Sequence, residues 1–557
     1  MKKYLSLFII LILLLSLSVP AFSESGTGTT YYVDAENGSD ENSGTDVNNA
    51  LRTLAAASEI TYSAGDRLLL KAGGIFTGGF TAKGGGTAEA PVVIGAYGDT
   101  DTFGRPIVRS DEEEAVLLTF HNVAGFVVEG LEFTAPNGSG IFITSDFHGT
   151  ASDITVRDCV FHDIWNKPCP NHNGAHCPIL IKSTGQYARI RSVTLSDCEI
   201  YDCAFGIKTR GLNREMNPDH FVSPEESYNS GFLFERISLH EILHDAVIIC
   251  GVNGMTVRDC SLINTSIRDD FYCAPMWSQH ACNYVIENCE IAGATNEKDG
   301  MAIDFDGWTT DAVCQYIYSH DNVRFINSCC CDNYTKNANC TVRYCLSVND
   351  NKANNSMANL IDVAAVDYAE DETPVCMENF RFYNNTLINC SSISCSGLSK
   401  SLIANNIFVG KDLMSSIQYM KKNVGRNGNF VTVFDGVFTN NCFNNMGSAS
   451  VSKNELNFDP GFAGTDLTDK DSFKLSVNSG LLGKGIQTEE DMGEHDFYGN
   501  ALSDTHNIGC YEGSGEEAAS ARLPLMRCVS LMRQLLGIRI ATLIGFIKNL
   551  SNTCWLF

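Results

Sequence analysis

Basic residues are scarce in this chain. Its 557 residues include 39 Lys and Arg against 66 Asp and Glu, which gives a formal net charge of −27 at pH 7. Nucleic-acid binding depends on Lys and Arg side chains that neutralise phosphate groups, so this balance argues against a nucleic-acid partner. The acidic surplus fits a soluble extracellular protein, and one that could bind Ca²⁺ through oxygen ligands.

The first 23 residues are typical of a secretory signal peptide. Lys2 and Lys3 precede an apolar stretch from Leu5 to Val19, and Ala21-Phe22-Ser23 provides small residues for cleavage. The absence of a cysteine directly after this site argues against a lipid-anchored form. We therefore expect an exported, extracellular protein.

A short phrase with a central cysteine recurs along the chain. In two later copies, at 383–387 and 404–408, asparagine fills the cysteine position. A phrase this short cannot bury its own apolar face, whereas stacked copies can, which predicts a solenoid. The cysteine-containing copies lie at 156–161, 195–200, 257–262, 286–291, 342–347 and 438–443.

The spacing of these copies predicts coils of about 20 residues with insertions. Apolar residues alternate within a coil, as in Ile303 and Phe305, and this period of two is typical of strands. Short strands stacked coil upon coil describe a parallel β-helix. We assign the recurring ladder position to Cys159, Cys198, His240, Cys260, Cys289, Ile317, Cys345, Asn385, Asn406 and Cys442.

Both ends of the repeat region resemble a known group. The segments 31–45 and 64–71 are similar to the opening of secreted right-handed parallel β-helix proteins of the pectate-lyase-like superfamily, and 458–462 with 507–512 resemble their closing cap. The resemblance implies a right-handed, single-stranded parallel β-helix domain over residues 24–513, with a carbohydrate as its partner. It does not fix the activity, because this superfamily includes lyases, hydrolases, epimerases and non-catalytic adhesins.

The C-terminal residues 514–557 do not continue the repeat. Basic residues interrupt an apolar pattern there, and no charge-free stretch is long enough to cross a bilayer. A helix that covers the end of the solenoid, a basic amphipathic helix with weak contact to a membrane surface, and a poorly ordered tail all stay open.

The cysteines have two interpretations. Those at the ladder position should stack about 4.8 Å apart as small buried apolar side chains. Cys169, His172, His176 and Cys177 lie together in an insertion and have the ligand types of a tetrahedral zinc site, although the segment could equally form a turn.

Candidate functional residues follow from the strand register. Aligning the coils on Gly211, Gly251 and Gly307 superimposes strands at 207–210 and 303–306, and side chains there alternate inward and outward. The outward columns then combine a basic end with an acidic end. They contain Lys208, Arg210, Asp304 and Asp306, with Lys182 beside Arg210 and Asp362 extending the acidic side.

Asp304 and Asp306 are the strongest catalytic candidates. Two residues apart on one strand, their Cα atoms should lie about 6.6 Å apart. Glycoside hydrolysis uses two carboxyl groups at separations that such a pair can reach. Paired outward aspartates on a β-helix could instead bind Ca²⁺ or simply solvate the sheet.

Further candidates come from insertions and from the next coil. His320, Asp321 and Asp270 are possible acids or bases, while Trp277 and His280 lie in a predicted loop at 267–281 that could contact sugar rings. Recurring aspartates at the position of Asp321 are also typical turn residues.

Three functions stay open. The first is an exported glycoside hydrolase that needs no cofactor and uses Asp304 with Asp306, Asp321 or Asp270. The second is a polysaccharide lyase that uses Lys208, Arg210 and Lys182, with Ca²⁺ possible. The third is a non-catalytic carbohydrate-binding solenoid. The chain lacks a lyase signature and the Gly-His-Gly and Arg-Ile-Lys motifs of polygalacturonase-like hydrolases, so the sequence alone does not choose among them.

Overall fold

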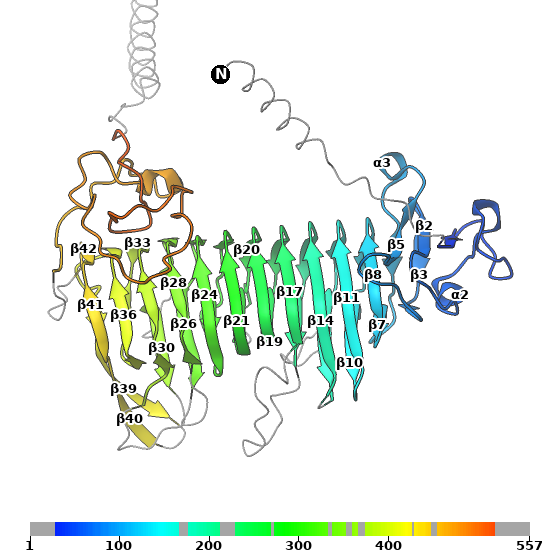
Figure 1. Ribbon diagram of the computed structural model, residues 1–557, viewed down its shortest axis with the longest axis horizontal. Coiled ribbons are helices and arrows are strands. Elements are labelled where there is room, and N and C mark those ends of the chain that lie inside the picture. Colours follow the sequence, from blue (N-terminus) through cyan, green and yellow to red (C-terminus); the bar gives the residue numbers. More distant parts are fainter. Residues whose placement is uncertain are drawn as a thin grey trace, which may run out of the picture.

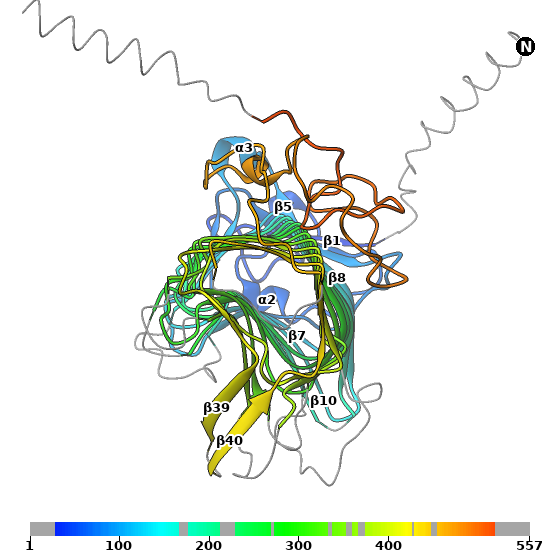
Figure 2. The same ribbon diagram turned by 90° about the vertical axis from the view of Figure 1, so that its left-hand side faces the viewer.

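The computed structural model is an elongated parallel β-helix (Figure 1). Viewed along its axis, the coils superimpose (Figure 2). It describes residues 28–165, 176–185, 187–211, 229–268, 272–331, 337–352, 359–365, 374–425, 428–446 and 454–518. The proposed signal peptide and most of the C-terminal tail lie outside these residues. Within the described part, no helix is long and apolar enough to span a membrane.

A complete coil contributes two strands to a large sheet and one strand to a small sheet. One coil runs through β23 (Met301–Phe305), β24 (Thr309–Gln315) and β25 (Tyr318–His320), and β26 (Arg324–Cys331) then pairs with β23 in parallel. Because the same three-strand unit repeats, a residue's position in its coil fixes which face of the molecule it occupies.

In the described residues the large sheet has 27 strands. Its other members are β1 (Thr30–Val33), β2 (Arg67–Lys71), β4 (Phe80–Thr81), β5 (Val92–Tyr97), β7 (Val116–His121), β8 (Ala124–Glu129), β10 (Ser139–Asp146), β11 (Thr150–Arg157), β13 (Ile179–Thr184), β14 (Arg189–Ser196), β16 (Ile207–Arg210), β17 (Asn229–Glu235), β19 (Val247–Arg258), β21 (Met276–Glu287), β27 (Asn337–Ala338), β28 (Thr341–Arg343), β30 (Asn359–Ala365), β31 (Met377–Glu378), β32 (Arg381–Tyr383), β34 (Ser392–Ser394), β35 (Leu398–Ser399), β36 (Ser401–Ala404), β38 (Ile417–Gln418) and β41 (Gly436–Thr439).

The small sheet has 13 strands in the same part of the chain, and a separate antiparallel hairpin joins β39 (Met420–Gly425) to β40 (Gly428–Val433). The other members of the small sheet are β3 (Ile75–Thr77), β6 (Ile107–Arg109), β9 (Glu132–Thr134), β12 (Val160–His162), β15 (Glu199–Cys203), β18 (Ser238–Ile242), β20 (Ser261–Thr265), β22 (Glu290–Ala292), β29 (Leu346–Val348), β33 (Thr386–Cys390), β37 (Ile407–Gly410) and β42 (Cys442–Asn444).

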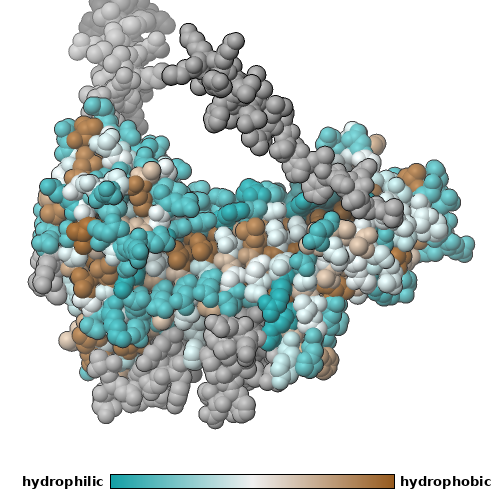
Figure 3. Space-filling view, viewed as in Figure 1, coloured by the Kyte–Doolittle hydropathy of each residue, from teal (hydrophilic) through white to brown (hydrophobic). Residues whose placement is uncertain are grey.

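The core is a continuous column of inward side chains between the two sheets. Ile143 and Ile181 occupy paired positions on β10 and β13 and are fully buried. Phe133 and Phe161 stack with ring centroids 4.8 Å apart and planes 12° apart. The predicted period-two alternation is therefore confirmed, and Figure 3 shows the mixed polar and apolar outer surface that results.

The ladder position largely follows the prediction, with two corrections. Ile237, and not His240, pairs with the neighbouring coils, because Ser238 faces Glu199 and Ser261 in the register. Asn441, and not Cys442, fills the last position, because Cys442 begins β42 opposite Ile407. The ladder cysteines are buried free thiols: Cys159, Cys198, Cys260, Cys289 and Cys345.

The two ends of the solenoid are closed differently. At the N-terminal end, the short helix α2 (Leu54–Ala57) buries Leu54 and Ala57 against the core, while α3 (Thr100–Phe103) lies apart from it, outside the outline of the coils (Figure 2). At the other end, residues 454–518 fold back over the last coils, where Leu456 forms a bridge to Cys442. Glu512 of this segment accepts a 2.9 Å hydrogen bond from the Tyr344 hydroxyl. Two 3₁₀ turns lie at Val47–Asn49 and Lys470–Phe473.

Candidate functional site

The strand register brings the predicted basic and acidic residues onto one face of the large sheet. Lys208 pairs with Ile248, which pairs with Trp277, which in turn pairs with Asp304. Asn327 follows Asp304 in the same file. We call this row the site file.

A second row runs beside the site file, two residues further along each strand. Lys182 on β13 pairs with Arg210 on β16, as predicted. The same register leads through Cys250 and Gln279 towards Asp306, whose backbone N–H donates to the Ser278 carbonyl at 2.8 Å. The adjoining rows therefore carry cations at one end and carboxyl groups at the other.

The outward side chains of the site file are largely buried. Lys208 is only 2% exposed and Asp304 only 5%, although neither belongs to the inward core column. The Lys208 ammonium lies 3.1 Å from the centroid of the Phe205 ring, which itself packs with Cys177 and Ala204 in a small apolar cluster. A charge removed from water needs compensating partners, and the aromatic ring supplies part of this compensation.

Asp304 is held from the neighbouring coil. Its Oδ1 accepts a hydrogen bond from the Asn327 side-chain amide at 3.0 Å, and Asn327 is 4% exposed. Asp306 lies just beyond the end of β23 and is partly exposed. The two carboxyl groups therefore share one face, with one buried and hydrogen-bonded and the other nearer to solvent.

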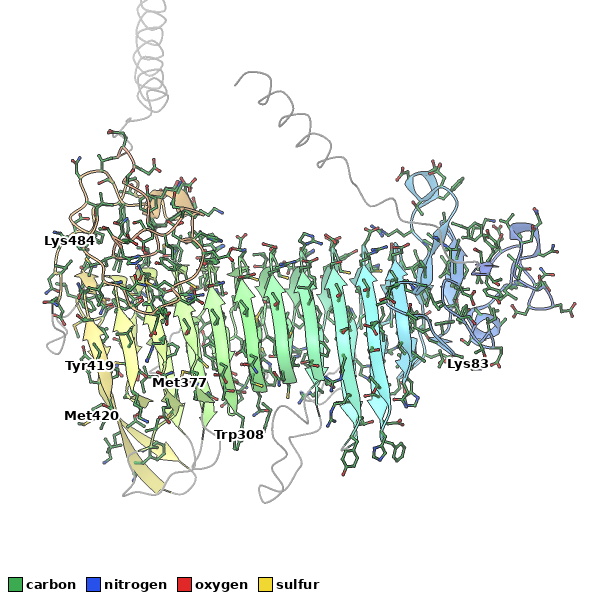
Figure 4. The ribbon with its side chains drawn as sticks, in the orientation of Figure 1. Lys83, Trp308, Met377, Tyr419, Met420 and Lys484 are labelled. Atoms are coloured by element: carbon green, nitrogen blue, oxygen red, sulfur yellow. The ribbon has the colours of Figure 1, made fainter. Side chains whose placement is uncertain are left out.

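Trp277 and His280 lie on strand β21, so their prediction as loop residues was wrong. Trp277 is partly exposed and occupies the position next to Asp304 in the site file. His280 lies within β21 and has a φ of 49°. Its ring stacks with that of Trp308 at a centroid distance of 6.2 Å. Figure 4 shows Trp308 at the lower edge of the sheet. Trp277 therefore places a large apolar ring beside Asp304.

The structure does not bring His320 and Asp321 to this face. His320 ends β25 in the small sheet, where its imidazole contacts Glu290 and Asp321, each at 3.1 Å. Although partial burial lowers it, hydrogen bonds to these two carboxylates raise the pKa of His320. His162 makes the same kind of contact with Glu132 and Asp163. It lies on β12, five strand steps from β25 along the small sheet.

The remaining predicted residues fall partly outside the described chain. Asp270, Cys169 and His172 are among the residues that the structure does not describe. His176 is 4% exposed and lies 3.2 Å from Glu114, and Cys177 is buried in the apolar cluster beside Phe205. In the described ranges, no three His, Cys, Asp or Glu side chains converge as a metal site would require.

Asn327 and Phe205 are site residues that the sequence reasoning missed. Phe325-Ile326-Asn327-Ser328 continues the alternation of Ala302-Ile303-Asp304-Phe305, so aligning Ile326 with Ile303 would have placed Asn327 beside Asp304. Phe205 precedes its strand by two residues, and the sequence carries no signal that its ring covers Lys208.

Comparisons with known proteins find one curated relative over a short segment and several solved structures. No protein-family model matches the chain. A lacto-N-biosidase from Bifidobacterium longum subsp. longum is 35% identical over 112 residues, a match that covers 17% of this chain and 7% of that enzyme. The solved structure of a GH136 lacto-N-biosidase from Eubacterium ramulus is 17% identical with a TM-score of 0.51, covering 77% of this chain and 67% of that one.

An alginate lyase from Paenibacillus sp. is 14% identical with a TM-score of 0.41, covering 57% of this chain and 97% of that one. The likeness to the Eubacterium enzyme confirms the parallel β-helix fold predicted from the repeat.

Proposed function

We propose that this protein is an exported glycoside hydrolase that acts on an oligosaccharide or polysaccharide. The observation that carries the proposal is the common face shared by Asp304, Asp306 and Trp277, with Asp304 anchored by Asn327. Most glycosidases use a pair of carboxyl groups that flank the scissile bond, and a neighbouring aromatic ring can pack against the sugar.

The two carboxyl groups divide the chemistry. One donates a proton to the glycosidic oxygen as the bond to the anomeric carbon breaks, and the other, ionised, acts on that carbon directly or through a water molecule. The side-chain amide of Asn327 donates a hydrogen bond to one carboxyl oxygen of Asp304. This hydrogen bond restricts the orientation of the Asp304 carboxyl group. Trp277 provides the apolar surface on which the sugar ring packs.

For the substrate, we propose an oligosaccharide with a terminal lacto-N-biose unit as the first candidate. The support is the name of the Bifidobacterium relative, which shares 35% identity over a short segment. Lys208 in the site file and Arg210 in the adjoining row would contact the substrate at the end of the face opposite the carboxyl groups.

The runner-up function is a polysaccharide lyase, which the adjacent cations Lys182 and Arg210 favour. Elimination removes the proton next to a uronate carboxyl group and needs a positive charge to stabilise the enolate. Asp304 and Asp306 would then have a role in holding Ca²⁺, which the hydrolase does not require.

One assay separates these functions. The purified protein is incubated with 4-nitrophenyl β-lacto-N-bioside and with a panel of neutral and uronate-containing polysaccharides, with and without EDTA. We expect nitrophenol release or new reducing ends, without ultraviolet-absorbing product and without an effect of EDTA. An increase in ultraviolet absorbance from unsaturated uronates would contradict hydrolysis and support a lyase. No cleavage of any substrate, together with measurable glycan binding, would support a non-catalytic binding solenoid.

A further inference from the structure

Three exposed rings gather where the strands of two neighbouring coils end. Phe147 and His148 form the turn between β10 and β11, and Tyr187 lies in the equivalent turn between β13 and β14. The His148 and Tyr187 rings stack with centroids 4.6 Å apart and planes 6° apart. Phe147 is 78% exposed and Tyr187 is 53% exposed. We call these three side chains the aromatic tip.

The aromatic tip is not explained by packing. Phe147 has a φ of 50°, a left-handed conformation that most side chains avoid and that here presents a phenyl ring to solvent. Many of the other non-glycine residues with positive φ in the described chain are Asp or Asn at turns. A bulky apolar residue that is both strained and exposed does not stabilise the solenoid, and such residues collect at functional surfaces.

The backbone beneath the tip is firmly held. The Asn122 side-chain amide donates to Asp146 at 2.7 Å, and the Asp146 backbone N–H donates back to Asn122 Oδ1 at 3.2 Å. Gly185 fits closely against the next coil, since a Cβ there would lie 2.7 Å from the Phe147 nitrogen. The rings are thus presented on a fixed support, which lowers the entropy lost when a ligand binds.

The tip lies along the same face as the candidate catalytic residues. From Asp306 the row runs through Gln279, Cys250 and Arg210 to Lys182, and Lys182 pairs with Thr144 on β10. Five strand steps separate β10 from β23, or about 24 Å at the usual spacing. Figure 1 shows the two coils around β10, β11 and β14 reaching further than the coils on either side, at the edge where Figure 4 places Trp308.

We propose that the aromatic tip is a carbohydrate-binding subsite that holds a distal part of a long glycan chain while another part occupies the face at Asp304 and Asp306. This inference rests on the proposed function, since it assumes that the occupant of that face is a sugar chain. The exposed phenyl ring of Phe147 and the outer face of the stacked His148–Tyr187 pair can pack against the flat apolar faces of pyranose rings, and a polymer can follow the strand steps between the two places.

The test uses the full chain with Phe147→Gly and Tyr187→Ala combined. Glycine accepts the φ of 50° at position 147, so this variant keeps the turn. Phe103→Ala is the matched control, because Phe103 is also an exposed phenylalanine, at 68%, but lies on α3 in the N-terminal cap. Melting temperatures of all proteins establish that they are folded.

Binding is measured by affinity gel electrophoresis in arabinoxylan, pectin and porcine gastric mucin, and turnover is measured with 4-nitrophenyl β-lacto-N-bioside. We expect the tip variant to lose about three- to tenfold in affinity for at least one polymer, the size of an aromatic contact. The control should bind as the wild type does, and turnover of the short substrate should be unchanged in the tip variant.

Equal retention of the wild type and the tip variant in all three gels, or no retention of the wild type in any of them, overturns the subsite. Loss of polymer binding in a protein that cleaves nothing would preserve the subsite and reject the hydrolase. The two proposals therefore fail separately.

Discussion

The histidines of the small sheet and the charged residues of the site file on the large sheet differ in how far they are buried. On the small sheet, His162 and His320 pair with carboxylates of their own and adjacent coils and keep 17% and 23% of their side chains exposed. On the large sheet, Lys208 and Asp304 are almost entirely buried in the site file. Exposed, locally neutralised pairs cost the fold little, whereas charges kept out of water are costly and persist where a site uses them.

Matched substitutions on the two sheets give the largest expected difference. Asp304→Asn removes a proton-transfer group and should lower kcat/KM by about a thousandfold, as general acid–base catalysis predicts. Asp321→Asn, on the small sheet, should change it by less than about twofold. Both are measured on whichever glycoside proves to be cleaved. An equal loss in both variants would contradict the division between the sheets.

Asp350 is a buried carboxyl group near the small sheet whose expected role is in stability. It is fully buried and accepts hydrogen bonds from Ser319, Ser347 and the Asn322 backbone and side chain. Burial raises the pKa of Asp350 to about 6. The folded state therefore holds this proton more tightly, so the contribution of Asp350 to stability is fully present below pH 4 and is lost as the pH rises through 6.

Asp350→Asn should remove this slope. Asparagine can accept the hydrogen bonds that Asn322 donates to Asp350 and can donate to both serine hydroxyls. At pH 7 the wild type should have lost about 3 kcal/mol relative to pH 4 through this residue, and the variant none. Urea unfolding at both pH values measures the difference, and parallel slopes in the two proteins would refute the assignment.

Asn327→Ala tests the support of the large-sheet site. Without the amide that holds Asp304 Oδ1, the carboxyl group loses its fixed orientation, and kcat should fall about tenfold to a hundredfold with little change in KM. A shift in the pH profile of kcat should accompany this fall, which a purely structural effect would not produce. Unchanged kinetics in a folded variant would remove Asn327 from the site.

The smallest expected effect concerns His320. Its contacts with Glu290 and Asp321 raise the pKa of His320, so the stabilisation is present below the ordinary histidine pKa and is lost as the pH rises through the raised value. His320→Gln should therefore lower the melting temperature at pH 6 more than at pH 9. The corresponding loss in the free energy of unfolding should be at most about 1 kcal/mol. Activity should stay unchanged.

Sequence alone predicted the fold because the repeat is also the structural unit. Period-two alternation fixed the inward side chains, and the glycine alignment placed Lys208, Asp304 and Arg210 in the observed rows. The ladder errors at His240 and Cys442 arose because a cysteine or histidine one to three residues from the true position fits the same phrase.

The burial of the candidate site could not be predicted in the same way. Whether an outward side chain meets water depends on which other segments lie over it, and strand periodicity carries no information about that. Phe205 covers Lys208 through a contact between a strand and the turn before it. Trp277 was misplaced because the polar residues ahead of β21 interrupt the alternation that would have marked the strand.

The segment 454–518 has a consequence for assembly. A parallel solenoid ends in a row of unpaired backbone groups, to which another copy could add its own first coil and so grow into a filament. Here Leu456 occupies a bridging position beside Cys442, and Gly509 donates to the Asn405 carbonyl at 2.7 Å. These contacts cover the last coil, so the first coil of another copy has no free strand edge to join there.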